Sequence, residues 1–197
     1  MFITVEGLDG SGTTTLSESL ADALEDTVLT QEPSDSWYGY DIRNRMGQEN
    51  SDPLIDTYLF FVDRVGHLRE EIEPALDRGK TVICDRYADS TRAYQPITLH
   101  RDDPRFDSSW EAKAFIEQSM APWLREPDLT LYLQIDPEEA IESASEDEKY
   151  ESLDMLVSVE ENYRALAQTQ DRIETIDASM SKEAVLRDAL SVARRRW

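Results

Sequence analysis

Short apolar runs recur along the chain and alternate with longer stretches in which apolar residues return every three or four positions. The short runs predict β-strands, which occupy Phe2–Val5, Thr27–Leu29, Thr81–Cys84, Leu129–Leu133 and Ile173–Ile176. The longer stretches predict helices, which occupy Leu16–Leu24, Leu54–Leu76, Trp110–Leu124, Leu153–Ala167 and Glu183–Val192. Strands that alternate with helices predict a three-layer α/β fold, in which a parallel sheet is covered by helices on both faces.

The segment between the first predicted strand and the first predicted helix is rich in glycine and hydroxyl side chains. Its sequence, GLDGSGTTT, runs from Gly7 to Thr15 and follows the P-loop spacing G-x-x-x-x-G-K-[ST], except that Thr13 stands where the motif has lysine. Such a loop directs backbone N–H groups and the positive end of a helix dipole at one point. The segment therefore predicts a phosphate site with Thr14 available for a magnesium ion; the alternative is a plain glycine-rich turn.

The residues that follow the other strands are further candidates, because ligands of parallel sheets bind beyond the carboxyl ends of the strands. Asp85 and Arg86 come directly after the third predicted strand. A carboxylate in this position can hold a magnesium ion through water, and an arginine beside it can clamp a phosphate with two hydrogen bonds. The alternative is an ordinary ion pair on the surface.

The charge balance narrows the choice of ligand. Asp and Glu total 42, Lys and Arg total 20, and the formal net charge is -22. A surface this acidic repels nucleic acids and anionic membranes, so we expect small phosphate ligands that meet locally gathered cations. An excess of carboxylate also suits concentrated salt, in which the Debye length falls to about 3 Å at 1 M. We therefore expect a halophilic source; an ordinary acidic protein is the alternative.

Length, hydropathy and cysteine usage point to one cytoplasmic domain that covers residues 1–197. No apolar run approaches the roughly 18–20 residues that a membrane-spanning helix needs. The N-terminus shows no basic segment followed by an apolar one, so no secretory signal is expected. Cys84 is the single cysteine, which rules out an intrachain disulfide and agrees with a reducing compartment.

Several motifs together resemble the thymidylate kinase family, whose members move a phosphoryl group from ATP to dTMP. They follow the family's order and spacing and cover nearly the whole chain: VEGLDGSG (5–12), TQEP (30–33), FFVDR (60–64), DRY (85–87), STRAYQ (90–95) and PDLTLYL (127–133). The resemblance implies a P-loop nucleoside monophosphate kinase fold with a five-stranded parallel sheet, flanking helices and a short lid, and it implies a homodimer. An acidic stretch at about 142–152 stands where the lid is expected; a solvated loop without a role is the alternative.

The resemblance also implies a dTMP pocket. In the family, a residue of the type of Phe60 stacks on thymine, one of the type of Arg64 hydrogen-bonds the carbonyl edge of the base, and one of the type of Gln95 reads the base from the other side. Without these companions, Phe60 would be interpreted as a core residue. Thr91 matches a residue near the base, Tyr94 one near the sugar and Asp9 one near the 3′-hydroxyl. The matches around the acceptor phosphate and the metal are Arg43, Arg86 and Glu32.

On the donor side, the chain departs from the family. The resemblance places the ATP phosphates on Asp9, Gly10, Ser11, Gly12, Thr13, Thr14 and Thr15, the adenine near Asp177 and Ala178, and Mg²⁺ on Thr14 and Asp85. Thr13 replaces the P-loop lysine, and Gln31 replaces the arginine that usually precedes Glu-Pro. We expect the transferred phosphoryl group to be met by Asp85 with its metal and by Arg86, Arg92 and Lys149, the last of which is the single cation of the expected lid.

Three functions remain open from the sequence. The first is transfer of the γ-phosphoryl group of Mg-ATP to dTMP, slowed by the loss of the P-loop lysine, since one well-placed cation is worth a few kcal/mol in a transition state. The second is a catalytically impaired nucleotide-binding protein that retains the dTMP pocket. The third is a kinase of another small nucleotide, because the expected pocket favours thymine without excluding uracil.

Overall fold

The computed structural model describes residues 1–45, 51–143 and 152–196. Its centre is a five-stranded parallel sheet with the strand order β2-β3-β1-β4-β5. The strands span Thr27–Gln31 (β2), Thr81–Asp85 (β3), Phe2–Gly7 (β1), Leu129–Gln134 (β4) and Ile173–Asp177 (β5). All five predicted strands are confirmed, and each extends one or two residues further toward its carboxyl end. Candidate site residues therefore lie at the last positions of strands.

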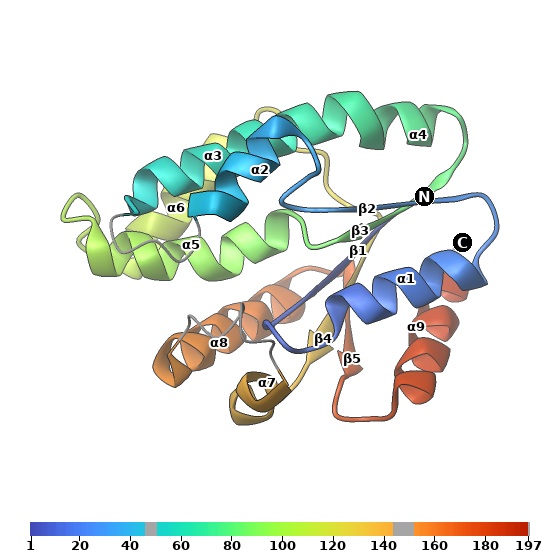
Figure 1. Cartoon of the computed structure of the whole chain (residues 1–197). Coiled ribbons are helices and arrows are strands. Elements are labelled where there is room, and N and C mark those ends of the chain that lie inside the picture. Colours follow the sequence, from blue (N-terminus) through green and yellow to red (C-terminus); the bar gives the residue numbers. More distant parts are fainter. Residues whose placement is uncertain (46–50, 144–151, 197) are drawn as a thin grey trace.

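Helices cover both faces of the sheet, as the alternating pattern predicted (Figure 1). One face is covered by α1 (Thr13–Ala23) and α9 (Lys182–Arg196), which pack against each other. The opposite face carries α3 (Pro53–His67), α4 (Glu73–Asp77), α5 (Ala88–Asp102) and α8 (Leu153–Thr169). In the described ranges, no helix combines the length and the apolar character that crossing a membrane requires.

Strand β1 lies between two layers of core because its side chains alternate between the faces of the sheet. Ile3 and Val5 pack with side chains of α1 and α9, whereas Phe2 packs with the core under α3 and α4. All six residues of β1 are buried. The loop that leaves β1 is consequently anchored on a fully buried strand.

Helix α3 begins at a well-defined cap and carries several candidate residues. The Asp52 carboxylate accepts hydrogen bonds from the backbone N–H groups of Leu54 and Ile55, and Pro53 occupies the first turn, where its missing N–H costs nothing. The predicted continuous helix Leu54–Leu76 is instead divided: a π-helical turn, η1 (Leu68–Ile72), joins α3 to α4. Apolar spacing could not show this change of winding, because the buried face continues through it.

Three helices in the described ranges were not predicted: α2 (Trp37–Arg45), α5 and α7 (Pro137–Ser143). Helix α5 contains Pro96 and begins with polar residues, so it shows little apolar periodicity. Helices α2 and α7 are short and mostly polar. Helix α6 (Ser109–Met120) ends before the predicted limit at Leu124. Tertiary packing against α3 and α8 stabilises these segments where local pattern does not.

The expected lid lies largely outside the described residues. Glu142 and Ser143 complete α7, and Ser152 caps α8 by accepting a hydrogen bond from the backbone N–H of Met155. Residues 144–151, which include Lys149, lie outside the described ranges. The lid and the proposed role of Lys149 therefore stay predictions.

Candidate active site

The glycine-rich loop between β1 and α1 has the backbone conformation that a phosphate site requires. Gly10 and Gly12 have φ angles of 82° and 91°, in the left-handed region that other residues rarely adopt. Among the described residues, no side chain caps the N-terminus of α1, and the Ser11 hydroxyl is buried without a hydrogen-bond partner. The helix N-terminus and this hydroxyl are thus available to an anion.

Thr14 and Asp85 meet at this loop, as the sequence predicted. The Thr14 hydroxyl donates a 2.5 Å hydrogen bond to Asp85 Oδ2, while Asp85 Oδ1 is buried and has no partner in the described part of the chain. A buried carboxylate oxygen without a partner is costly unless a cation or water completes it. The described residues contain no cluster of three metal-ligating side chains. This pair suits Mg²⁺, which commonly takes one or two protein oxygens, substrate phosphates and several waters.

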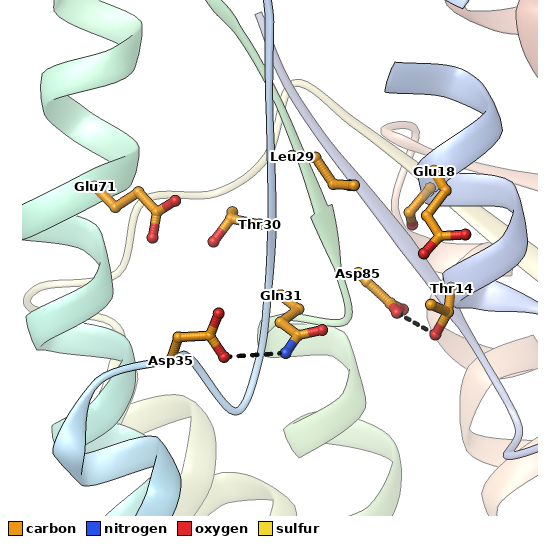
Figure 2. A pocket seen from close by; sticks show the side chains of 9 residues that line it. Thr14, Glu18, Leu29, Thr30, Gln31, Asp35, Glu71 and Asp85 are labelled. Atoms are coloured by element: carbon orange, nitrogen blue, oxygen red, sulfur yellow. Dashed lines mark hydrogen bonds between the residues drawn. The ribbon is translucent and has the colours of Figure 1, made fainter. Parts of the chain in front are cut away.

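A pocket of about 230 Å³ lies beside this pair (Figure 2). In Figure 2, Thr14 and Asp85 stand on one side of Gln31, and Asp35 and Glu71 on the other. Its lining includes four carboxylates, those of Glu18, Asp35, Glu71 and Asp85. Four carboxylates in one pocket favour a bound cation and disfavour a phosphate group there.

Arg86 is the cation that touches the P-loop in the described structure. Its guanidinium donates to the Gly7 carbonyl at 2.9 Å and forms an ion pair with Asp9. Burial alone would lower its pKa, but the charge of Asp9 and of other neighbours outweighs burial, so the pKa lies well above the ordinary value and Arg86 is permanently charged. The backbone of Arg86 is left-handed, with φ of 63°. Such a conformation costs about 1–3 kcal/mol for a bulky residue and is typical of functional sites.

Glu6, on β1, accepts hydrogen bonds from the segment that follows Arg86. Its carboxylate accepts hydrogen bonds from the Tyr87 backbone N–H at 2.8 Å and from the Ser90 hydroxyl at 2.6 Å. Burial and the charge of Asp89 raise the pKa of Glu6 to about 7. The strained backbone at Arg86 is therefore flanked by a fixed contact at the next residue.

Arg64 and Thr91, two of the residues predicted to lie near the base, meet in a buried polar cluster. Arg64 is 1% exposed and donates to Glu32 at 2.8 Å and to the Thr91 hydroxyl at 3.0 Å. The second Glu32 oxygen faces the ring of His67 at 3.2 Å. The structure thus brings Arg64 and Thr91 together as expected. Glu32 is 6% exposed and engages Arg64 and His67 with its two oxygens, and its expected role near the acceptor phosphate and the metal stays a prediction.

The other residues predicted for the acceptor lie on α2, α3 and α5. Phe60 is half-buried on α3, one turn before Arg64, and Gln95 is half-buried on α5. The Tyr94 ring lies against the Arg86 guanidinium, with 5.9 Å from the guanidinium carbon to the ring centroid. Arg43, on α2, donates to the carbonyls of Pro33 and Ser34. These contacts hold Arg43 against the turn that follows Glu32.

Arg92 lies in a network of ion pairs. Its guanidinium contacts Asp89 at 2.9 Å, Glu117 at 2.8 Å and Glu126 at 2.6 Å. Asp89 is also paired with Arg172, so the partly buried network links α5, α6 and the start of β5. These three carboxylates would compete with a phosphate for Arg92, and its role toward the transferred phosphoryl group stays a prediction.

The predicted adenine residues stand apart from the P-loop contacts. Asp177 ends β5, the edge strand of the sheet, and accepts hydrogen bonds from the backbone and the hydroxyl of Ser179. The Ala178 backbone donates to Gln134 at the end of β4. Both residues lie at the carboxyl edge of the sheet, separated from β1 by β4. Their role toward adenine stays a prediction.

His67 was not predicted as a site residue. It is 3% exposed, and its ring contacts Glu32, Thr30 and Glu71. One signal could have shown this, because His67 is three residues after Arg64 and so shares its helix face. Thr30 and Glu32, at the end of β2, are distant from His67 in sequence, and only the fold brings them to α3.

Comparisons with known proteins agree with this geometry. The family model described as thymidylate kinase matches residues 5–189. A probable thymidylate kinase of Halorubrum lacusprofundi is 44% identical over 187 residues, which are 94% of this chain and 93% of that protein. One of Halobacterium salinarum is 42% identical over 191 residues, covering 96% and 93%. The crystal structure of thymidylate kinase from Ehrlichia chaffeensis matches with a TM-score of 0.77 and 26% identity, over 98% of each chain.

These similarities extend over nearly the whole length of the chain, in sequence and in fold. The family model begins at Val5, in the strand that leads into the P-loop, and continues into α9. The chain therefore belongs to the thymidylate kinase family and is a nucleoside monophosphate kinase that phosphorylates dTMP.

Proposed function

We propose that the chain transfers the γ-phosphoryl group of Mg-ATP to dTMP and releases dTDP and ADP. One observation carries this proposal: the unpartnered Asp85 Oδ1 lies beside Thr14 at the N-terminus of an uncapped helix, next to an arginine that is held at the P-loop. A metal-bound triphosphate supplies what each of these groups lacks, namely a cation for the carboxylate and an anion for the helix.

The reaction needs positioning and charge more than acid–base chemistry. A phosphate oxygen of dTMP forms a bond to the γ-phosphorus, while the bond between this phosphorus and the β–γ bridging oxygen breaks. The acceptor is already a dianion, so no residue has to remove a proton. Arg86 and Arg43 face the negative charge of the phosphates, and Mg²⁺ held by Thr14 and Asp85 would neutralise the β- and γ-phosphates when bound.

A coupled assay of ADP release tests the proposal. It contains ATP, Mg²⁺ and dTMP in molar KCl, with dUMP and AMP as alternative acceptors. We expect turnover that requires dTMP and exceeds the rate with either alternative. Binding of dTMP in calorimetry without any turnover would contradict the proposal and favour an impaired nucleotide-binding protein, the alternative that Thr13 and Gln31 raise.

Replacing Phe60 with alanine tests the acceptor pocket. Stacking of a base on an aromatic ring is worth about 1–3 kcal/mol, so we expect the Kd for dTMP to rise about tenfold or more. The Kd for ATP should stay within about twofold, because ATP binds at the opposite side of the P-loop in this proposal. Calorimetry with each nucleotide measures both, and Val157→Ala, at an exposed site on α8, serves as the control. An equal loss of both affinities would show a folding defect instead.

We also propose a homodimer formed through α3. Ile55, Tyr58 and Val62 lie on one stripe of this helix and are 50%, 50% and 44% exposed. Exposed apolar residues in a row mark an interaction surface, and a second copy would bury the same stripe on both sides. We expect sedimentation analysis to find a dimer in the wild type and a monomer in Tyr58→Glu. A monomeric wild type at micromolar concentration would contradict this.

A salt-rich cytoplasm is the proposed working environment. Cys84 is a buried free thiol among the described residues, which agrees with a reducing compartment. The net charge of -22 and the relatives from Halorubrum and Halobacterium agree with a halophilic source. Concentrated salt screens the repulsion between surface carboxylates and leaves the short, partly buried pairs of the site less affected.

A further inference from the structure

His67 stands at the end of α3 between the acceptor pocket and the pocket beside the metal pair. Its Nδ1 faces Glu32 Oε1 at 3.2 Å, and its Nε2 faces the Thr30 hydroxyl at 2.7 Å and Glu71 Oε2 at 3.5 Å. The π-helical turn η1 begins at the next residue and carries Glu71. Such turns are frequent at functional sites.

A continuous set of polar contacts runs from His67 into the base-reading cluster. His67 contacts one oxygen of Glu32, and Arg64 contacts the other at 2.7 and 2.8 Å. The Nη2 of Arg64 then donates to the Thr91 hydroxyl. Arg64, Glu32 and His67 are each less than 7% exposed, so water cannot replace a lost partner cheaply.

We propose that His67 is a positioning residue for the acceptor: by holding Glu32 Oε1 it fixes the carboxylate that orients Arg64 and Thr91 toward the base. This inference rests on the proposed dTMP pocket and adds a residue to it. His67 touches neither nucleotide in this scheme. The effect of His67 is transmitted by Glu32. Without His67, the Glu32 carboxylate would keep a buried lone pair without a donor and would turn away from Arg64.

Two substitutions separate the contacts of the two ring nitrogens. In His67→Asn, the amide nitrogen is as many bonds from Cα as Nδ1, so it retains a donor toward Glu32. In His67→Gln, the amide nitrogen corresponds to Nε2, so it retains the contact with Thr30 and loses Glu32. We expect the Kd for dTMP to rise about tenfold in H67Q and by less than about threefold in H67N, with the Kd for ATP unchanged in both.

The pH dependence of dTMP binding is a second readout. Burial lowers the pKa of His67, but Glu32 and Glu71 outweigh burial and raise it to about 9. The groups that face the ring are Glu32 after β2, Thr30 on β2 and Glu71 on η1, with Arg64 one turn earlier on its own helix. Below pH 9 the ring is charged and attracts Glu32. We therefore expect wild-type affinity for dTMP to fall more steeply than the affinity of H67N as pH rises through 9, because ionisation of the thymine N3–H affects both proteins alike.

Calorimetry with dTMP and with ATP measures these effects whether or not the protein turns over. His100→Gln, an exposed histidine on α5 that contacts the Phe106 carbonyl, is the matched control and should bind dTMP as the wild type does. If H67Q fails to fold, Glu32→Gln tests the same link and should raise the Kd for dTMP by a similar factor.

The outcomes separate this inference from the proposed function. An unchanged Kd for dTMP in H67Q, or equal losses in H67Q and H67N, overturns the inference while leaving the kinase proposal intact. A parallel loss of dTMP and ATP affinity also overturns it, since that is the effect of loosened packing. A wild type that binds dTMP without turnover contradicts the proposed function, and the Kd comparison still decides the role of His67. A wild type without dTMP affinity overturns both.

Discussion

Replacing Arg86 with glutamine is expected to lower kcat for phosphoryl transfer by about two to three orders of magnitude. Removal of one preorganised donor to a developing negative charge costs about this much. Arg86 is held in place by the Gly7 carbonyl, by Asp9 and by the face of Tyr94. Its left-handed backbone is energetically unfavourable, and the surrounding contacts offset this cost. Because its pKa lies well above the ordinary value, the loss should not vary with pH between 6 and 9.

Steady-state kinetics with ATP and dTMP measure this effect, with unfolding followed separately. Arg86→Lys should recover part of the rate, since it restores the charge without the planar pair of donors. Arg187→Gln removes an exposed arginine of α9 that is paired with Asp188, and it should leave the rate within twofold. Loss of less than about tenfold in R86Q would show that another cation meets the transferred group.

Replacing Thr13 with lysine is expected to raise kcat at least tenfold. Thr13 begins α1 directly after Gly12, in the position where the P-loop motif places the lysine that reaches the β- and γ-phosphates. In the described structure, Asp9 and Asp85 flank the loop, and the contacting cation is Arg86. An added ammonium would meet both these carboxylates and the triphosphate, at the point where negative charge gathers during transfer.

Single-turnover kinetics distinguish faster chemistry from faster product release in T13K. Thr13→Met is the control, because methionine adds comparable length at a buried position without charge. We expect T13M to be as slow as the wild type or slower. If T13K is not faster, a cation already occupies this place, and Lys149 of the expected lid becomes the foremost candidate.

The chain is strongly acidic and, among its described residues, has few cations near the P-loop, so we expect the loss or gain of one cation there to change kcat strongly. The chain has 22 more acidic than basic residues, and much of its described basic charge is committed to structural pairs such as those of Arg92 and Arg172. Arg86, Arg64 and Arg43 gather at the carboxyl ends of β1, β2 and β3. We therefore expect phosphate affinity to depend on these local cations, whose short, partly buried contacts resist screening by salt.

Local patterns were enough to predict the sheet and the P-loop. Apolar runs located all five strands: β1, β3 and β4 are buried on both faces, and the edge strands β2 and β5 are only partly buried. The glycine spacing located the tight loop between β1 and α1, because only glycine adopts the φ angles of Gly10 and Gly12 at little cost. The same reasoning placed Asp85 beside Thr14, since residues that follow parallel strands share one edge of the sheet.

The partners of each candidate arginine were decided by tertiary structure. Arg86 and Arg92 are six residues apart and were both candidates from the sequence, yet one contacts Asp9 and the other contacts Asp89, Glu117 and Glu126. Their partners come from distant segments that pack together only in the fold. For the same reason the sequence did not single out His67, although strand β2 brings Thr30 and Glu32 against it.

The sequence by itself therefore determined the fold class, the phosphate loop and the absence of its lysine, because backbone conformation and strand burial depend on residue type at each position. The tertiary structure decided which charged side chains remain available to a ligand and which neutralise one another. A buried charge needs a partner, and only the folded chain shows which partner it has.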